Sequence, residues 1–208
     1  MFTGIIQALC PVIKVSDSAG IRSLRVDLNE LAQGLELGAS VAINGVCLTV
    51  TEIDQNFVDF EIIEETLSLT NLGSLTCGSL VNTERSLSYG QEVGGHVVSG
   101  HITEAVEIIR IDEKPQNKLI ALKVRKELAK YLFDKGFVAI DGASLTVFHV
   151  DREASIVEIA LIPETIRRTT IGFRVVGEFV NLELDSQTVV TVDSVERISR
   201  SAQHIANT

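Results

Sequence analysis

The feature that most constrains this chain is that its two halves repeat each other. Residues 41–50 read VAINGVCLTV and residues 138–147 read VAIDGASLTV, so seven of ten positions are identical at a spacing of 97 residues. A period this long exceeds the roughly 20–50 residues of a solenoid repeat. The sequence therefore predicts one domain of about 90 residues, present twice.

The match extends to both sides of this block and keeps its order. Corresponding positions are Thr3-Gly4 with Ser99-Gly100, Leu31 and Leu35 with Leu128 and Leu132, Glu65-Thr66 with Glu164-Thr165, Val81-Asn82 with Val180-Asn181, and Glu84 with Glu183. The spacing drifts between 96 and 99 residues, as short loop insertions would produce. We therefore expect the duplication to cover nearly the whole chain.

Each copy is mainly β in character. Residues 24–28 alternate apolar and polar side chains, as a half-buried strand requires. The dipeptides Asn44-Gly45 and Asp141-Gly142 interrupt β-branched runs and predict tight hairpins, because both residues tolerate a positive φ. Many short strands with few helices favour a small closed barrel per copy, since closure removes exposed strand edges. Short helical patches are expected only near residues 28–35 and 128–132.

The C-terminal tail has a helical pattern instead. Apolar residues recur at 3-4-3 spacing at Val195, Ile198, Ala202 and Ile205. Asp193 with Glu196 three residues later is typical of a capping box, which predicts a helix over residues 193–207. Its apolar stripe must pack either on its own chain or against other copies of the chain.

Composition excludes several classes of function. The net charge of −10, with 28 acidic and 18 basic residues, argues against a nucleic-acid partner. There is no apolar run of 18 residues, so no membrane-spanning helix is expected, and the first residues do not read as a signal peptide. Three irregularly spaced cysteines (Cys10, Cys47 and Cys77) fit neither a disulfide framework nor a zinc site, which favours a reducing cytoplasm.

Two of the four histidines lie between the copies, in the segment GGHVVSGH at residues 94–101. Glycine lets the backbone approach a ligand closely, and histidine transfers protons near neutral pH. His101 is the stronger candidate for chemistry, whereas His96 is better explained as the cap of a turn. A metal site is not expected, because no third ligand lies nearby in the sequence.

Cys47 is the second candidate, and its counterpart in the repeat is Ser144. Strand periodicity places Cys47 with Thr49, and Ser144 with Thr146, on one face of each copy. Such matched polar pairs indicate hydrogen bonds to the same kind of ligand. The alternative for Cys47 is a small buried apolar residue, and Cys10 and Cys77 are interpreted as structural.

A third matched element follows a strand in each copy, at residues 64–66 and 163–165. Its Glu and Thr residues are suited equally to capping a turn and to contacting a ligand. Lys135 precedes Gly136 in a loop, where it either meets an anionic ligand atom or is simply solvated.

Taken together, these motifs resemble the riboflavin synthase alpha-chain family. The resemblance rests on residues 1–6 (MFTGII), 44–50, 94–101, 141–147 and 161–165, and it covers essentially residues 1–200 in order. It implies an all-β fold of two tandem six-stranded antiparallel Greek-key β-barrels followed by a C-terminal α-helix. The implied domains are a lumazine-binding barrel at 1–96, a second at 97–188, and a helix at 189–208 that assembles a homotrimer.

The resemblance also implies the reaction. Family members convert two molecules of 6,7-dimethyl-8-ribityllumazine into riboflavin and 5-amino-6-ribitylamino-pyrimidinedione by moving a four-carbon unit. No metal or organic cofactor is required, and each site lies between the first barrel of one subunit and the second barrel of its neighbour. The implied partners are thus two lumazine molecules per site, the riboflavin product and two further copies of the chain.

Site residues follow from the resemblance by position. The lumazine on the first barrel is expected to contact Thr3, Gly4, Ile5, Ile6, Cys47, Leu48, Thr49, Glu61, Ile62, Ile63, Glu64, Glu65, Thr66, Gly100, His101 and Ile102. The lumazine on the second barrel is expected to contact Lys135, Ser144, Leu145, Thr146, Ala160, Leu161, Ile162, Pro163, Glu164 and Thr165. The catalytic candidates are His101 as proton shuttle, Cys47, Ser40, Thr146 and Asp185. Ser40 corresponds to Phe137, which suggests that the copies divide the roles.

Two alternatives belong to other classes of protein. Lumazine proteins share the duplicated fold but are non-catalytic fluorescent carriers, and retention of His101, Cys47 and Ser40 favours the enzyme. An unrelated flavin-binding reductase barrel would require a Gly-rich nucleotide-binding turn between a strand and a helix, and the sequence has none.

Overall fold

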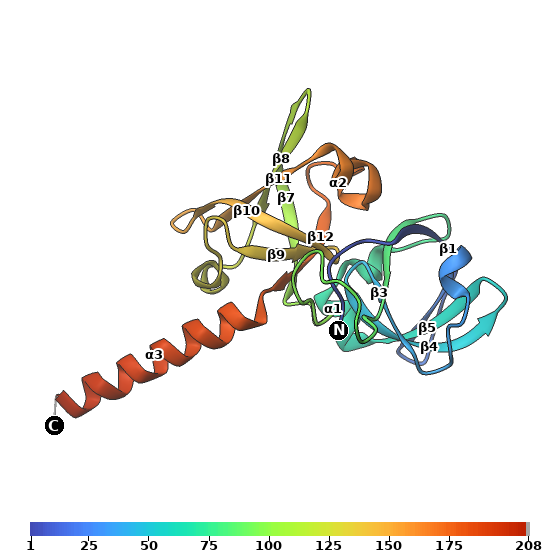
Figure 1. Ribbon diagram of the computed structural model, residues 1–208, viewed down its shortest axis with the longest axis horizontal. Coiled ribbons are helices and arrows are strands. Elements are labelled where there is room, and N and C mark those ends of the chain that lie inside the picture. Colours follow the sequence, from blue (N-terminus) through green and yellow to red (C-terminus); the bar gives the residue numbers. More distant parts are fainter. Residues whose placement is uncertain (207–208) are drawn as a thin grey trace.

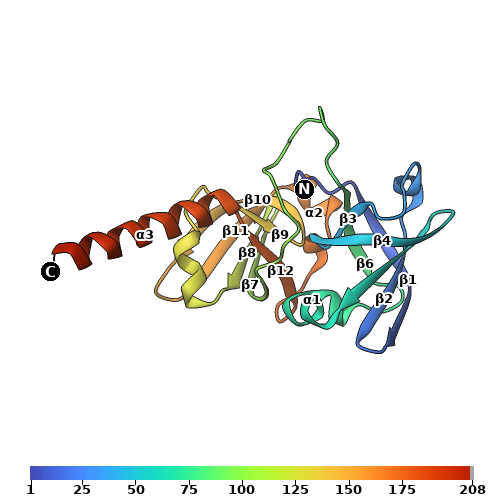
Figure 2. The same ribbon diagram turned by 90° about the horizontal axis from the view of Figure 1, so that it is seen from below.

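Two closed β-barrels lie side by side, and one long helix projects from the second (Figures 1 and 2). This computed structural model describes residues 1–206. The first barrel contains β1 (Ala8–Ser18), β2 (Ile21–Asp27), β3 (Ser40–Ile43), β4 (Val46–Asp54), β5 (Phe57–Ile63) and β6 (Leu80–Arg85). The second contains β7 (Glu104–Lys114), β8 (Asn117–Lys123), β9 (Phe137–Ile140), β10 (Ala143–Asp151), β11 (Ile156–Leu161) and β12 (Phe179–Leu184).

The two barrels have the same topology. Around the first barrel the strand order is β1-β2-β5-β4-β3-β6, and the second repeats it as β7-β8-β11-β10-β9-β12, with every pair antiparallel. In each copy three consecutive strands are linked by hairpins, β3-β4-β5 in the first barrel, and an earlier strand, β2, pairs with the last of them. This is the Greek-key arrangement. The predicted fold class is confirmed.

The two predicted tight hairpins connect β3 to β4 and β9 to β10. Asn44 and Gly45 have φ angles of 46° and 80°, and Asp141 and Gly142 have 44° and 81°, as a type I′ turn requires. The tips of the hairpins touch each other, because a Cβ on Gly45 would lie 2.5 Å from the Gly142 nitrogen. These glycines are therefore needed both for the turns and for the contact between the barrels.

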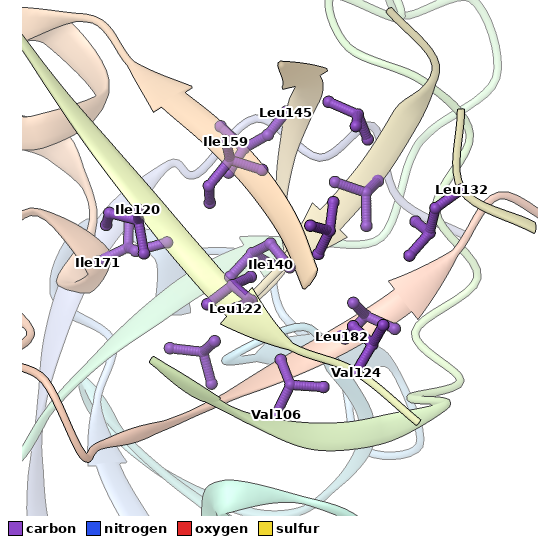
Figure 3. Packing of buried hydrophobic residues seen from close by; sticks show 14 of the residues in the cluster. Val106, Ile120, Leu122, Val124, Leu132, Ile140, Leu145, Ile159, Ile171 and Leu182 are labelled. Carbon is purple, nitrogen blue, oxygen red and sulfur yellow. The ribbon is translucent and has the colours of Figure 1, made fainter. Parts of the chain in front are cut away.

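Aliphatic side chains fill both barrels, as Figure 3 shows for the second. Along β4 the buried residues are Val46, Leu48 and Val50, and the residues between them face outward. The strand β10 repeats this alternation, with Leu145 in the core. A small barrel needs no tryptophan for such a core, because branched aliphatic residues pack well on a pleated surface.

Short helices connect the strands. They are η1 (Asn29–Ala32), α1 (Glu64–Leu69), η2 (Asn71–Ser74), η3 (Lys126–Tyr131), α2 (Pro163–Arg168) and η4 (Thr170–Phe173). The helical patches expected near residues 28–35 and 128–132 are the short 3₁₀-helices η1 and η3. None of the helices described within residues 1–206 is long and apolar enough to cross a membrane.

The C-terminal helix α3 (Ser186–Ala206) starts earlier than the sequence pattern predicts. The capping box at Asp193 is wrong, because Asp185 caps the helix by accepting hydrogen bonds from the Thr188 backbone nitrogen (3.0 Å) and hydroxyl (2.6 Å). Asp193 instead lies inside the helix and accepts a bond from the Tyr131 hydroxyl (2.6 Å). Residues 188–192 are all β-branched and weak helix formers, which hid the first turns. The side chain of Ile205 and residues 207–208 lie outside the described part of the chain.

A buried polar network joins the barrels across an approximate twofold axis. The Asn82 amide donates to the Asp141 carbonyl (2.8 Å), and the Asn181 amide donates to the Asn44 carbonyl (2.9 Å). Both asparagines are fully buried. Their side-chain oxygens accept from the backbone nitrogens of Thr170 (2.8 Å) and Asn71 (2.7 Å) respectively. Buried polar groups satisfied this completely hold one relative orientation of the barrels.

Candidate functional site

Each barrel presents a polar patch on the outer face of one hairpin. The first platform is Ser40, Cys47 and Thr49 on β3 and β4, and the second platform is Phe137, Ser144 and Thr146 on β9 and β10. Ser40 lies directly opposite Thr49, and Phe137 lies directly opposite Thr146. Directly opposed residues point to the same face of a sheet, so each platform is one continuous surface. The predicted shared face of Cys47 with Thr49, and of Ser144 with Thr146, is confirmed.

Two extended segments cross between the barrels, and each docks on one platform while leaving Thr49 or Thr146 exposed. The N-terminal arm (residues 1–7) precedes β1, and the central arm (residues 97–103) precedes β7. They pair with each other at Phe2 and Val98, whose backbone nitrogens and oxygens bond at 2.7 and 3.1 Å. Phe2 is completely buried, and the N-terminus lies between the barrels in both views (Figures 1 and 2).

Beyond this crossing, each arm docks on the barrel of the other half. The Gly4 carbonyl accepts a hydrogen bond from the Ser144 nitrogen (2.8 Å), and the Gly100 carbonyl accepts one from the Cys47 nitrogen (3.0 Å). Ile6 is buried in the core of the second barrel, whereas Ile102 packs against the core of the first. The expected placement of Thr3, Gly4, Ile5 and Ile6 with the first barrel is therefore corrected, because this arm lies on the second platform.

The glycines of the arms serve contacts within the protein. Gly4 and Gly100 have φ angles of 73° and 85°, and a Cβ on either would lie 2.5 Å from the Cβ of Ser144 or Cys47 respectively. A Cβ on Gly95 would lie 2.4 Å from the Thr3 carbonyl oxygen. The expectation that these glycines make room for a ligand is thus replaced by close packing of arm on platform.

Two buried carboxylates anchor the arms. Glu84 accepts hydrogen bonds from the Thr3 nitrogen (2.6 Å), the Thr3 hydroxyl (2.6 Å) and the Gly4 nitrogen (3.0 Å). Glu183 accepts the equivalent bonds from the Ser99 nitrogen (2.7 Å), the Ser99 hydroxyl (2.7 Å) and the Gly100 nitrogen (3.0 Å). Burial raises the pKa of both carboxyls, and these hydrogen bonds oppose the rise. Thr3 matches Ser99 in the repeat, and Glu84 matches Glu183. The sequence did not predict that each arm residue contacts one of these carboxylates.

On the second platform, His96 contacts Ser144, and the sequence did not predict this contact. His96 Nδ1 lies 2.7 Å from the Ser144 hydroxyl, and its ring stacks on Phe137 with centroids 5.2 Å apart. Burial lowers the pKa of His96, and the negative charge of Asp185 opposes this effect. The imidazole is therefore held neutral and bonded to a hydroxyl that faces the platform surface.

The first platform has a different arrangement. Cys47 is a half-buried free thiol beneath the central arm. The next arm residue after Gly100 is His101, whose side chain is exposed and whose backbone nitrogen donates to the Ser99 hydroxyl (3.1 Å). The structure thus brings His101, Cys47 and Ser40 to the first platform, and His96 and Ser144 to the second.

Several predicted site residues cannot offer their side chains to a ligand on the platforms. Leu48, Ile62, Leu145 and Leu161 point into the barrel cores, so only their backbone could take part. Asp185 differs from these four, because it caps α3 by accepting hydrogen bonds from Thr188 while its half-buried side chain also acts on His96 of the second platform, so its catalytic role stays a prediction. Strand alternation explains the inward positions of the four apolar residues, and helix capping explains the hydrogen bonds of Asp185.

The remaining predicted residues line the outer edges of the platforms. On the first barrel, Glu61 and Ile63 end β5 with exposed side chains, and α1 begins with exposed Glu64 and Glu65, followed by half-buried Thr66. On the second, Ala160, Ile162, Pro163, Glu164 and Thr165 occupy the equivalent places. Glu164 pairs with Arg167 (2.5 Å) and Arg168, and this lowers its pKa.

Lys135 is held in a left-handed conformation at φ 67°, where the first copy has Gly38. Its nitrogen donates to the Val147 carbonyl (2.9 Å), and its ammonium group lies 5.7 Å from the centre of the Phe148 ring. Left-handed backbone costs a lysine about 1 kcal/mol, so surrounding structure must hold it there. The charge is thereby placed beside Phe148, two residues beyond Thr146 on the same strand.

A large hollow in the described part of the molecule lies elsewhere. It is a groove of about 940 Å³ between the barrels, and none of the predicted site residues lines it. The platforms are instead open surfaces in a single chain. Within residues 1–206, no cluster of His, Cys, Asp and Glu has the arrangement of a metal site.

Comparison with known proteins matches this architecture. The family model of the lumazine binding domain matches twice, at residues 3–86 and 99–185, so each match begins in an arm and ends with a barrel. Riboflavin synthase of Escherichia coli (strain K12) is 44% identical over 209 residues, covering 100% of this chain and 97% of that protein. The chain belongs to the riboflavin synthase family. The synthases of Chlamydia pneumoniae (43% identical, covering 97% and 98%) and Bacillus subtilis (38%, covering 89% and 85%) are similar over most of their lengths.

Solved structures of another protein, LumP, show the same fold. LumP complexed with riboflavin superposes with a TM-score of 0.82 at 24% identity, covering 89% of this chain and 100% of that one. LumP complexed with 6,7-dimethyl-8-(1'-D-ribityl) lumazine gives a TM-score of 0.80 at 23% identity. At this identity the likeness extends to the fold alone.

Proposed function

We propose that this chain is a riboflavin synthase that converts two molecules of 6,7-dimethyl-8-ribityllumazine into riboflavin and 5-amino-6-ribitylamino-pyrimidinedione. The observation that carries the proposal is the pair of equivalent platforms, one per barrel, each with its own arm. A reaction between two identical molecules needs two similar sites. The duplicated domain of this family supplies them within one chain.

The chemistry is balanced by the two substrates alone. One lumazine loses a proton from its C7 methyl group, and the other accepts water or a hydroxyl group as a nucleophile at its own C7. The nucleophile leaves again and the proton is returned before the products are released. Two carbons and their methyl groups then move from one ring system to the other, so that the atoms of the two products equal those of two substrates. Holding the two rings face to face can lower the barrier by several kcal/mol.

The two platforms have different chemistry, which suits a reaction in which one lumazine donates and the other accepts. On the first platform, we assign His101 to move the methyl proton, with Cys47 and Ser40 beside the ring. On the second, Thr146 and the Ser144 hydroxyl held by His96 (2.7 Å) face the bound molecule. Exposed Glu and Thr side chains at the platform edges are suited to the ribityl hydroxyls.

We further propose that the working site forms between the first platform of one subunit and the second platform of its neighbour in a homotrimer. Each platform is an open surface with a large exposed apolar residue at its edge, Ile63 on the first barrel (54% exposed) and Ile162 on the second (62% exposed). The protruding α3 likewise exposes Val195 (58%) and Ile198 (67%). We place the protein in the cytoplasm, consistent with its three free cysteines.

The alternative function is a non-catalytic lumazine or flavin carrier. The LumP structures share the fold at 22–24% identity, whereas the riboflavin synthases are 37–44% identical to this chain. The catalytic candidates His101, Cys47 and Ser40 are all present on one platform. Both observations favour the enzyme.

The deciding experiment is to incubate the purified protein with 6,7-dimethyl-8-ribityllumazine and to follow riboflavin by absorbance. Formation of one riboflavin for every two lumazines consumed supports the proposal. Tight binding without turnover would establish the carrier instead. His101→Ala should reduce turnover more than His96→Ala, and equal losses would contradict the assignment of the proton shuttle to His101.

A further inference from the structure

We propose that Glu84 and Glu183 are positioning residues that act across the molecule, each on the platform of the barrel to which it does not belong. Glu84 lies on β6 of the first barrel and holds the N-terminal arm against Ser144 of the second. Glu183 lies on β12 of the second barrel and holds the central arm against Cys47 of the first. The proposal rests on the proposed function, since it concerns the same two sites.

The first step is the contact between carboxylate and arm. One oxygen of Glu84 accepts both the nitrogen and the hydroxyl of Thr3, and the other accepts the Gly4 nitrogen. Glu183 repeats this pattern with Ser99 and Gly100, and each equivalent distance agrees within about 0.1 Å. Both side chains are nearly buried, with 3% and 5% of their surface exposed. Three bonds to one buried carboxylate fix the direction of the following peptide.

The second step is the contact between arm and platform. The peptide that Glu84 orients presents the Gly4 carbonyl to the Ser144 nitrogen (2.8 Å). The peptide that Glu183 orients presents the Gly100 carbonyl to the Cys47 nitrogen (3.0 Å). Each carboxylate therefore sets the backbone of the residue that carries the candidate reactive group. It does so without touching the platform itself.

The consequence is that the two platforms depend on each other's barrels. An arm that follows only its own barrel would leave each site independent. Here a displacement of β6 moves the arm on the second platform, and a displacement of β12 moves the arm on the first. These crossed contacts hold the two lumazine sites of one chain in a fixed relative geometry.

Thiol reactivity provides a test that does not depend on catalysis. In a Cys77→Ser background, Cys47 reports on the first platform through its rate of reaction with 5,5′-dithiobis(2-nitrobenzoate), because Cys10 is buried. We expect Glu183→Gln to accelerate this reaction by about tenfold, since the amide offers a donor where Gly100 needs an acceptor. Glu84→Gln, in the same barrel as Cys47, should change the rate less than twofold.

The reciprocal experiment uses Ser144→Cys with Cys47→Ser and Cys77→Ser. There Glu84→Gln should accelerate labelling and Glu183→Gln should not. The proposal would be overturned if each Gln variant accelerated the labelling of the thiol in its own barrel, or if each variant accelerated the labelling of both thiols equally. If a Gln variant does not fold, Thr3→Val and Ser99→Ala are the substitutes. Each removes the hydroxyl that donates to the carboxylate and accepts from the backbone nitrogen two residues on, and each should give the same crossed pattern at about threefold.

Ligand binding completes the test. With riboflavin as the probe, Glu84→Gln should weaken binding to the second platform and spare the first, and Glu183→Gln should do the reverse. If the wild-type chain fails to convert lumazine while the crossed thiol pattern holds, the proposed function fails and the positioning role stands. If the wild-type chain is active and the pattern is not crossed, the positioning role fails alone.

Discussion

At the scale of single residues, equivalent positions in the two copies have diverged in chemistry while keeping their geometry. Cys47 and Ser144 occupy the same place on matched hairpins and bond to matched arms. Within the part of the chain that the structure describes, Ser144 has a histidine partner, His96, for which Cys47 shows no counterpart. The duplication thus supplies two similar sites, and a few substitutions differentiate them.

His96 leads to a prediction about pH. Its folded-state pKa is lowered by burial, so the unfolded chain binds this proton at a higher pH than the native protein does. The stabilisation is complete above the ordinary pKa of about 6.5 and is lost as the pH falls through the lower native value. Urea unfolding of the wild type should therefore lose stability on acidification below about pH 6.5 relative to His96→Gln.

The glycines of the arms lead to a second prediction. Gly100→Ala should cost about 1–3 kcal/mol and reduce turnover at least tenfold, because a Cβ there meets Cys47 at 2.5 Å. Gly78→Ala is the matched control, since Gly78 also has a positive φ (90°) but nothing lies within 4 Å. It should show the strain of about 1 kcal/mol without the loss of turnover. Equal turnover in the two variants would remove the arm from any role in the site.

At the scale of elements, β-strands and turns are dictated locally, whereas α3 depends on its setting. The strand alternation and the Asn-Gly and Asp-Gly turns predicted from the sequence are confirmed, because inward and outward positions alternate with period two. The start of α3 was mistaken because its first turns are β-branched. Its cap at Asp185 and its contacts to Tyr131 and Lys130 decide the boundary.

The exposed stripe of α3 leads to a prediction about assembly. A chain truncated after Thr191 should retain both folded barrels and fail to form trimers, because the truncation removes Val195 and Ile198, which are 58% and 67% exposed in the single chain. Sedimentation measures the assembly and circular dichroism measures the fold. Ile198→Glu should have the same effect in the full-length chain, and Ser199→Glu, off the stripe, should not. A truncated chain that still sediments as a trimer would contradict this role for α3.

At the scale of the whole molecule, the barrels are joined by a buried polar network and by a small apolar cluster of Phe2, Ala42, Val98 and Ala139. Asp141 is completely buried, and burial raises its pKa while Arg174, at 3.3 Å, opposes the rise. The first copy has the uncharged Asn44 at this position. The network is nevertheless nearly symmetric in its amide contacts.

Removing one of these amides should loosen the pair of barrels. Asn181→Ala should lower the free energy of unfolding by about 2–4 kcal/mol, because it leaves the Asn44 carbonyl and the Asn71 nitrogen buried without partners. Urea denaturation measures the change, and exposed Gln187→Ala serves as the control. A loss below about 0.5 kcal/mol would mean that the network contributes little to holding the barrels together.

The sequence by itself determined the duplication, the barrels, the two hairpins and the face on which each platform residue lies. The duplication follows from identical residues about 97 positions apart, whereas the strands, the hairpins and the outward faces follow from local periodicity and turn chemistry, which act over a few residues. Only the tertiary structure decided which arm docks on which barrel, and hence that Gly4 belongs with Ser144, and that Glu84, 81 residues from Thr3, anchors it. The two copies are so similar that a crossed and an uncrossed arrangement use the same residues. Local pattern cannot distinguish them, whereas the pairing of Phe2 with Val98 between the barrels does.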